Sequence, residues 1–128
     1  MAASNLVIDT SIFIEYLRAK NKKDTVLFSI SDNLKLFIST VTLYELYMGA
    51  TTEEKKLDVR LLTEGITILP FNEDVAQIAA NIYHDLRTTN QMIEFRDIFI
   101  AATCLAYNFP LKTLNGKHFN RVKDLVIN

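Results

Sequence analysis

Short apolar segments that alternate with longer helical patterns are the feature that most constrains the fold of this 128-residue chain. Each apolar segment has three to five residues and polar or turn-forming neighbours, which is typical of strands buried on both faces. The expected strands cover residues 6–8, 36–38, 66–69, 110–114 and 125–127. Because helices separate them, we expect an α/β domain with three layers, in which helices flank both faces of a short, mainly parallel sheet.

Helical periodicity fills most of the remaining sequence. It is clearest after Asn72, a good N-cap residue, where Val75, Ile78, Ala79, Ile82, Tyr83 and Leu86 make one apolar face. Further helices are expected over residues 10–17, 24–31, 40–48, 53–62 and 96–107, with Gly49 ending the third. Without repeats, low-complexity segments or a change of composition, residues 1–128 are expected to form a single domain.

The composition is that of a globular protein, with 49% hydrophobic and 23% charged residues. The single cysteine, Cys104, excludes an intramolecular disulfide and lies in an apolar helical stretch, so we expect it in the core. No apolar run reaches the roughly 18 residues of a membrane span, and the N-terminal segment lacks the regions of a signal peptide. We therefore expect a cytoplasmic protein with no membrane partner.

The net charge is almost zero, with 14 Lys and Arg against 15 Asp and Glu, whereas nucleic-acid-binding proteins usually have a basic surface. The basic residues are clustered, however. The N-terminal basic cluster is Arg18, Lys20, Lys22 and Lys23, and the C-terminal basic cluster is Lys112, Lys117, Arg121 and Lys123. Either cluster can be a solvated surface or a guide for a phosphate backbone, and both interpretations stay open.

Three carboxylates have apolar neighbours in the sequence. Asp9 follows the first strand, Glu45 is the one acid of residues 41–47, and Asp97 precedes the uncharged run at residues 98–111. Ligand sites of parallel sheets lie at the carboxyl ends of the strands, where these acids can converge. Converging carboxylates would repel each other, and a bound cation would relieve the repulsion. Without clustered His or Cys, the ligands suit Mg²⁺ or Mn²⁺, which can activate water for attack on a phosphodiester.

Each acid also has a structural interpretation. Asp9 can accept hydrogen bonds from amides of the next helix, and Asp97 can be a helix N-cap. Glu45 can complete a capping box with Thr42. The two histidines, His84 and His118, are expected to be a surface or packing residue and a lone residue of a basic segment, without support as ligands.

Four segments of the chain have the form of family motifs, namely VIDTSIF at residues 7–13, STVTLYEL at residues 39–46, RDIFIAATC at residues 96–104 and LKTLNGKHF at residues 111–119. They resemble motifs of the PIN-domain ribonuclease family, in particular the VapC-type toxins of VapBC toxin–antitoxin pairs. Any one of them would be a weak indication. Four of them in the family's order, over nearly the whole chain, are a strong one.

The resemblance implies a PIN-like fold and an endoribonuclease that depends on Mg²⁺ or Mn²⁺ and cleaves RNA, with tRNA and rRNA as candidate substrates. It also implies a homodimer and a cognate antitoxin that inserts a segment into the acidic groove. The implied catalytic and metal-binding residues are Asp9, Glu45 and Asp97, and the implied supporting residues are Thr10, Ser11, Thr113 and Asn115.

One position departs from the family pattern. Many relatives have a further acid before the late phenylalanine, but this chain has His118 before Phe119. Glu94, three residues before Asp97, is a candidate replacement, and the number of metal ions, one or two, stays open.

Two alternatives to a nuclease remain. The first is a regulatory PIN-like domain with weak or no turnover that binds RNA or protein. The second is a phosphatase or phosphoacceptor domain with Asp9 as its nucleophile, although Ser11 stands where such phosphatases usually have a second aspartate.

Overall fold

A four-stranded parallel sheet lies at the centre of the computed structural model, which describes residues 5–128. Its strands are β1 (Asn5–Ile8), β2 (Lys35–Ser39), β3 (Thr67–Leu69) and β4 (Leu111–Lys112), in the spatial order β3-β2-β1-β4. Neighbouring strands pair in parallel throughout this order. Parallel pairing requires a crossover connection between strands, which the intervening helices provide. The prediction of a mainly parallel sheet is confirmed.

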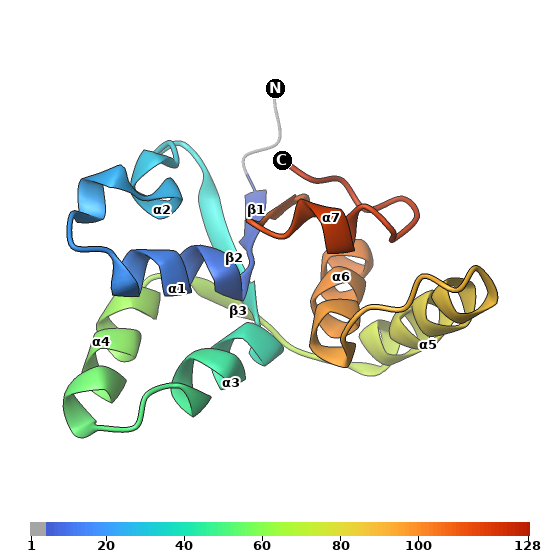
Figure 1. The fold of residues 1–128 in the computed structure, drawn as a ribbon, viewed down its shortest axis with the longest axis horizontal. Helices are drawn as coiled ribbons and strands as arrows, with labels where there is room; N and C mark the ends of the chain where they lie inside the picture. Colours follow the sequence, from blue (N-terminus) through green and yellow to red (C-terminus); the bar gives the residue numbers. More distant parts are fainter. Residues whose placement is uncertain (1–4) are drawn as a thin grey trace.

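Helices form the crossovers and cover both faces of the sheet. They are α1 (Thr10–Arg18), the 3-10 helix η1 (Lys22–Asp24), α2 (Val26–Ser29), α3 (Thr40–Met48), α4 (Glu53–Thr63), α5 (Glu73–Thr88), α6 (Phe95–Tyr107) and α7 (Gly116–Phe119). Figure 1 shows α1, α2 and α4 on one side of the strands and α5 and α6 on the other. The predicted three-layer α/β/α arrangement is therefore confirmed.

The sheet separates two hydrophobic cores because successive side chains of a strand point to opposite faces. Leu6 and Ile8 of β1 pack in the core that β1 and β2 share with α1, α3 and α4, whereas Val7 packs in the core with α5 and α6. In β2, Ile38 packs in the core with α1, α3 and α4, and Phe37 packs in the core with α5 and α6. Each of these five residues is at most 6% exposed, which explains why the strands are continuously apolar.

Side-chain caps mark where several helices begin, among them α3 and α5. Ser39, the last residue of β2, accepts a hydrogen bond from the amide of Thr42, so α3 starts directly at the end of that strand. Asn72 caps α5 through the amide of Val75, as predicted. Each such cap contributes roughly 1 kcal/mol to stability. Gly49 ends α3, also as predicted, but with a right-handed backbone (φ −79°).

The expected helix over residues 24–31 is wrong in its extent. The chain forms η1 and α2 instead, because Thr25 has an extended backbone (φ −100°, ψ 156°) that interrupts helical hydrogen bonding. The Thr25 hydroxyl caps α2 by accepting from the amide of Phe28 at 3.4 Å. The local apolar pattern therefore indicated the packing side of this segment but not its break.

The expected strand over residues 125–127 is also wrong. Within the described chain, Ile127 makes only an isolated parallel bridge with Leu111, after Asp124 turns the backbone in the left-handed region (φ 68°). β4 is likewise shorter than the expected strand over residues 110–114. The four-residue helix α7 was not predicted, because one turn is too short to show an apolar period.

The helix α6 is buried on several sides, as its sequence predicted. Its buried residues are Ile98, Ile100, Ala101, Ala102, Thr103 and Cys104. Cys104 is 1% exposed, and this burial raises the pKa of its thiol, so it packs in the core as expected. None of the helices within residues 5–128 has the length and apolar character required to cross a membrane.

Phe119, at the end of α7, is expected to anchor the C-terminal segment because its side chain is fully buried, whereas Phe28 is 58% exposed. We expect Phe119→Ala to lower the free energy of unfolding by about 3–5 kcal/mol through lost burial and a cavity. The control Phe28→Ala is expected to change it by less than about 0.5 kcal/mol. Urea unfolding followed by circular dichroism measures both, and equal losses would contradict the anchoring role.

Candidate active site at the carboxyl edge of the sheet

Three acids come together where the strands end. Asp9 directly follows β1 and is 2% exposed, and Glu45 lies on α3, which continues from β2. Asp97 lies in the first turn of α6. The negative charges of Asp9 and Glu45 both act on the Asp97 carboxyl, so the three groups share one electrostatic environment.

Two hydroxyl groups hold the Asp9 carboxylate. Ser11 Oγ donates to Asp9 Oδ2 at 2.6 Å, and Thr113 Oγ1 donates to the same oxygen at 2.8 Å. The hydroxyls are themselves held, since Ser11 accepts from the amide of Leu114 and Thr113 from the amide of Asn115. All hydrogen bonds to this carboxylate from residues 5–128 go to Oδ2, so Oδ1 is left for a ligand. Bonds to a charged group are about twice as strong as neutral ones, which makes this contact an effective clamp.

A chain of buried hydroxyls holds Glu45. Thr10 Oγ1 donates to Glu45 Oε1 at 2.7 Å and lies 3.0 Å from Thr42 Oγ1. Ser39 Oγ lies 3.3 Å from Thr42 Oγ1. Because each hydroxyl has one proton, donation to the carboxylate requires Thr10 to accept from Thr42, and Thr42 to accept from Ser39. The capping-box interpretation of Glu45 is therefore wrong, since its carboxylate bonds Thr10 instead of the helix start.

The structural interpretations of the other two acids are wrong as well. Asp9 is the N-cap residue of α1 by position, yet its side chain makes no cap hydrogen bond. The N-cap of α6 is Glu94, three residues before Asp97. Neither aspartate side chain caps its helix.

The pKa of the Asp97 carboxyl is raised in the folded protein. Burial raises this pKa above the ordinary value, and the charges of Asp9 and Glu45 raise it further. His118 lowers this pKa, and its Nδ1 lies 3.5 Å from Asp97 Oδ2. The histidine that replaces the family's further acid therefore faces the site, which its position in a basic segment did not indicate.

Arg96 is a site residue that the sequence analysis missed. Its Nε lies 3.5 Å from Glu45 Oε2, and the Arg96 side chain is 46% exposed. The available indication was a single base directly before Asp97, at the start of an otherwise uncharged helix. This guanidinium balances part of the negative charge of the site.

The donor atoms of the site fit a hard divalent cation. Asp9, Glu45 and Asp97 supply carboxylate oxygens, and the pKa of Asp97 is raised first by burial and then by the charges of Asp9 and Glu45. As the side chains lie, no three His, Cys, Asp or Glu residues in the described part of the chain form a group that could hold a metal ion.

The remaining candidates lie elsewhere or have structural contacts. Glu94 is exposed and lies in a shallow depression beside His118 and Arg121, and it is not among the charges that shift the pKa of Asp97. His84 is exposed on α5, as predicted. Asn115 is exposed, and its contribution is the backbone bond to Thr113.

Both basic clusters contain a residue that stabilises the fold. Lys22 Nζ donates to the carbonyl oxygens of the last turn of α1, namely those of Tyr16, Leu17 and Ala19. Arg121 Nη1 donates to the carbonyl oxygen of Met92 at 3.1 Å and lies 3.5 Å from that of Gln91. Lys117 and Lys123 are exposed and lie in the C-terminal basic cluster.

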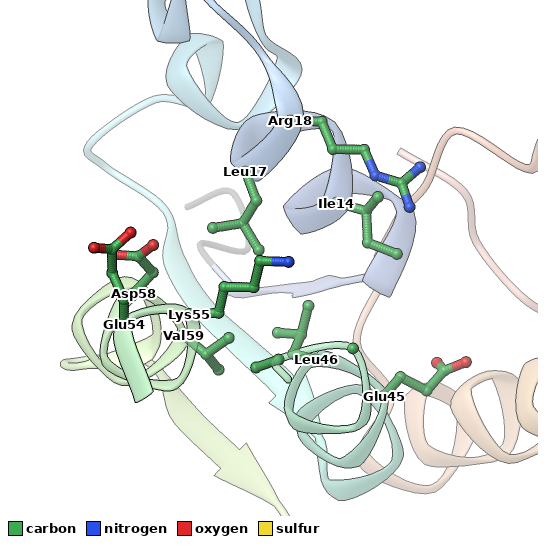
Figure 2. A pocket seen from close by; sticks show the side chains of 11 residues that line it. Ile14, Leu17, Arg18, Glu45, Leu46, Glu54, Lys55, Asp58 and Val59 are labelled. Atoms are coloured by element: carbon green, nitrogen blue, oxygen red, sulfur yellow. The ribbon is translucent and has the colours of Figure 1, made fainter. Parts of the chain in front are cut away.

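A cleft of about 380 Å³ opens beside the acids, between α1, α3 and α4. Figure 2 shows Glu45 at one end of this cleft, with the apolar side chains of Ile14, Leu17, Leu46 and Val59 at its centre. Charged residues of α1 and α4 surround the centre, namely Arg18, Glu54, Lys55 and Asp58. The cleft therefore has an apolar centre, and one carboxylate of the acidic site, that of Glu45, lies at its end.

Comparison with known protein families matches the PIN domain over residues 6–125. The chain belongs to the PIN-domain family. Ribonuclease VapC of Rickettsia bellii (strain RML369-C) is 33% identical over 129 residues, which cover 95% of this chain and 93% of the relative. The PIN domain resembles VapBC-1 of nontypeable Haemophilus influenzae (TM-score 0.83, 29% identity, 97% and 96% of the two chains). It also resembles FitAcB of Neisseria gonorrhoeae (TM-score 0.79, 29% identity, 96% of each chain).

The raised pKa of Asp97 predicts a pH-dependent cost to folding. A carboxyl whose pKa is raised in the folded state stabilises the fold only while protonated, and that stability is lost as the pH rises through the folded-state pKa. In EDTA, Asp97→Asn is therefore expected to raise the melting temperature of the PIN domain at neutral pH. The advantage should shrink as the pH falls toward the ordinary carboxyl value of 3.8. Thermal unfolding of both proteins, with the exposed Asp85→Asn as control, measures the effect, and a gap that is independent of pH would contradict it.

Proposed function

We propose that this PIN domain is a metal-dependent endoribonuclease that hydrolyses RNA phosphodiesters, with residues 1–128 acting as one domain. The observation that carries the proposal is the set of three converging carboxylates, in which Asp9 and Glu45 raise the pKa of Asp97. Membership of the PIN-domain family and the name of the relative Ribonuclease VapC support the reaction class.

Under this proposal Asp9, Glu45 and Asp97 are the catalytic residues and hold Mg²⁺ or Mn²⁺. Such an ion, when bound, polarises a phosphoryl oxygen and lowers the pKa of a water that attacks phosphorus. The hydroxyls of Ser11 and Thr113 fix the Asp9 carboxylate by donating to Oδ2, so Oδ1 would be available to the ion. Rigid ligands matter because a misplaced donor loses much of its effect on the transition state.

Thr10 has the corresponding role for Glu45, and Asn115 supports the site through its backbone bond to Thr113. Arg96 lies beside Glu45 and its side chain is 46% exposed, so its guanidinium could pair with a phosphate of the RNA. A further acid at position 118 would provide carboxylate oxygens for a second metal ion, but this chain has the nitrogens of His118 there. We therefore propose a site for a single ion.

We also propose that the PIN domain is the toxin of a toxin–antitoxin pair and forms a homodimer in the cytoplasm, where its RNA substrate is found. The likeness to VapBC-1 supports a protein partner of the antitoxin type. The cleft of Figure 2 suits an apolar antitoxin segment that ends near Glu45, since its centre is apolar and its end is acidic. A segment seated there would block the acids.

A binding-only PIN domain is the second candidate. The observation in its favour is that the three acids do not form a closed metal site as they lie, together with His118 in place of an acid. No observation on residues 5–128 favours a phosphatase. Turnover distinguishes the two remaining candidates.

Cleavage of total cellular RNA in Mg²⁺ or Mn²⁺ tests the nuclease. We expect discrete fragments from the wild type, none in EDTA, and a loss on the order of 100-fold or more in Asp9→Asn and Asp97→Asn. A metal contributes several kcal/mol to the transition state, which corresponds to a loss of that size. Asp85→Asn, an exposed acid on α5, is the matched control and should cleave like the wild type. Metal binding without cleavage would favour the binding-only domain.

The C-terminal basic cluster is expected to guide the RNA backbone. Lys117→Glu combined with Arg121→Glu should weaken RNA binding and make it less sensitive to salt. Each lost contact with a single-stranded phosphate reduces the slope of log K against log salt by roughly 0.7. The control is Lys56→Glu, an exposed lysine on α4 that pairs with Glu53. Titration of a labelled oligoribonucleotide at several salt concentrations measures the affinity and its salt dependence. Equal slopes for the wild type, the double variant and Lys56→Glu would contradict a role of the C-terminal basic cluster in RNA binding.

A further inference from the structure

Phe95 is an unusually exposed aromatic residue beside the acidic site. Its exposed fraction is 64%, the largest among the large apolar residues of the described chain. It is the first residue of α6 and precedes Asp97 by two positions. A phenylalanine ring stabilises a fold in proportion to its buried area, so this ring does little for stability.

A depression of about 460 Å³ lies next to this ring, which is within the size range of small-molecule sites. We call it the Phe95 depression, and it is lined by Met92, Ile93, Glu94, Phe95, His118 and Arg121. It joins the loop between α5 and α6 to the C-terminal segment, because Arg121 donates to the carbonyl oxygen of Met92. Its shape is therefore held by contacts across the chain.

The same depression borders the acids. His118, one of its lining residues, lies with Nδ1 3.5 Å from Asp97 Oδ2. A molecule in the depression is therefore placed one side chain away from the site proposed for cleavage. The charges of Glu94 and Arg121 offset each other within it, and the exposed Lys117 directly precedes His118 in α7.

An exposed aromatic ring, a depression whose acid and base balance in charge, and a neighbouring cation match the chemistry of one unpaired nucleotide. Proteins that bind single-stranded RNA stack bases on exposed aromatic rings and hold the phosphates with basic residues. We propose that the Phe95 depression binds one unpaired nucleotide of the RNA substrate, its base stacked on Phe95, beside the phosphodiester to be cleaved. This inference rests on the proposed ribonuclease function and names a substrate subsite for it.

A protein partner fits the depression less well. A stable protein interface buries about 800 Å² on each side, with a well-packed apolar centre. The apolar lining here consists of three side chains, namely Met92, Ile93 and Phe95, with an acid, a base and a histidine around them. The cleft of Figure 2 has more apolar residues at its centre, namely Ile14, Leu17, Leu46 and Val59.

A tryptophan reporter tests the stacking directly, because the chain contains no tryptophan. Phe95→Trp and the control Phe28→Trp are made in the Asp97→Asn background, so that RNA is bound without being cut. Phe28 is matched in exposure, at 58%, and lies on α2. A five-nucleotide single-stranded RNA should quench the tryptophan at position 95 saturably, and the same oligomer with abasic sugars should not. The tryptophan at position 28 should respond to neither.

Affinity variants in the same background complete the test. Phe95→Leu keeps apolar bulk but removes the ring, so it should weaken oligomer binding by roughly 5- to 150-fold, the range of one lost base stack. Phe95→Tyr keeps the ring and should retain the affinity. An unchanged affinity in Phe95→Leu, or equal quenching at positions 95 and 28, would overturn the proposal. A changed sedimentation mass in Phe95→Leu with unchanged RNA affinity would overturn it too, and would assign the patch to a protein contact.

Failure of this inference and failure of the proposed function give different results. Quenching at position 95 in a protein whose wild type cuts no RNA would keep the nucleotide site and reject the nuclease. Cleavage by the wild type without a response at position 95 would keep the nuclease and reject the nucleotide site.

Discussion

The burial of Leu6, Val7 and Ile8 in β1 is the constraint on which the rest of the structure depends. This strand pairs with β2 on one edge and β4 on the other, and it contributes Leu6 and Ile8 to one core and Val7 to the second. No polar side chain can be accommodated along its buried length without a large desolvation cost. Asp9 is therefore the first residue at which the chain can present a charge, and its place is determined by the end of the strand.

Hydroxyl groups convert this position into an oriented site. Ser11 and Thr113 fix one oxygen of Asp9, and Thr10 links the start of α1 to Glu45 on α3. These bonds satisfy the buried polar atoms, and no buried side-chain nitrogen or oxygen of residues 5–128 lacks a partner. They do not neutralise the acids, so the raised pKa of Asp97 persists. The fold thus keeps the Asp97 carboxyl partly buried beside two further acids, and the proposed metal ion would offset their negative charge.

Two surfaces of the PIN domain, the apolar cleft and the Phe95 depression, border the acidic site. Glu45 belongs both to the acidic site and to the apolar cleft proposed for an antitoxin segment. His118 belongs both to the acidic site and to the Phe95 depression proposed for a nucleotide. The two proposed ligands therefore approach the acids from different helices, the antitoxin along α1, α3 and α4 and the RNA along α6 and α7.

The sequence by itself determined the features that depend on near neighbours along the chain. Apolar runs located the strands, the apolar period after Asn72 located α5, and apolar flanks singled out Asp9, Glu45 and Asp97. Only the tertiary structure decided the contacts between distant segments: the bond from Thr113 to Asp9, the chain from Ser39 through Thr42 and Thr10 to Glu45, the pairing of Arg96 with Glu45, and the approach of His118 to Asp97. Periodicity and capping report interactions over a few residues, whereas hydrogen bonds and ion pairs between segments exist only at distances set by packing. For the same reason, the break at Thr25 and the single bridge at Ile127 could be seen only in the folded chain.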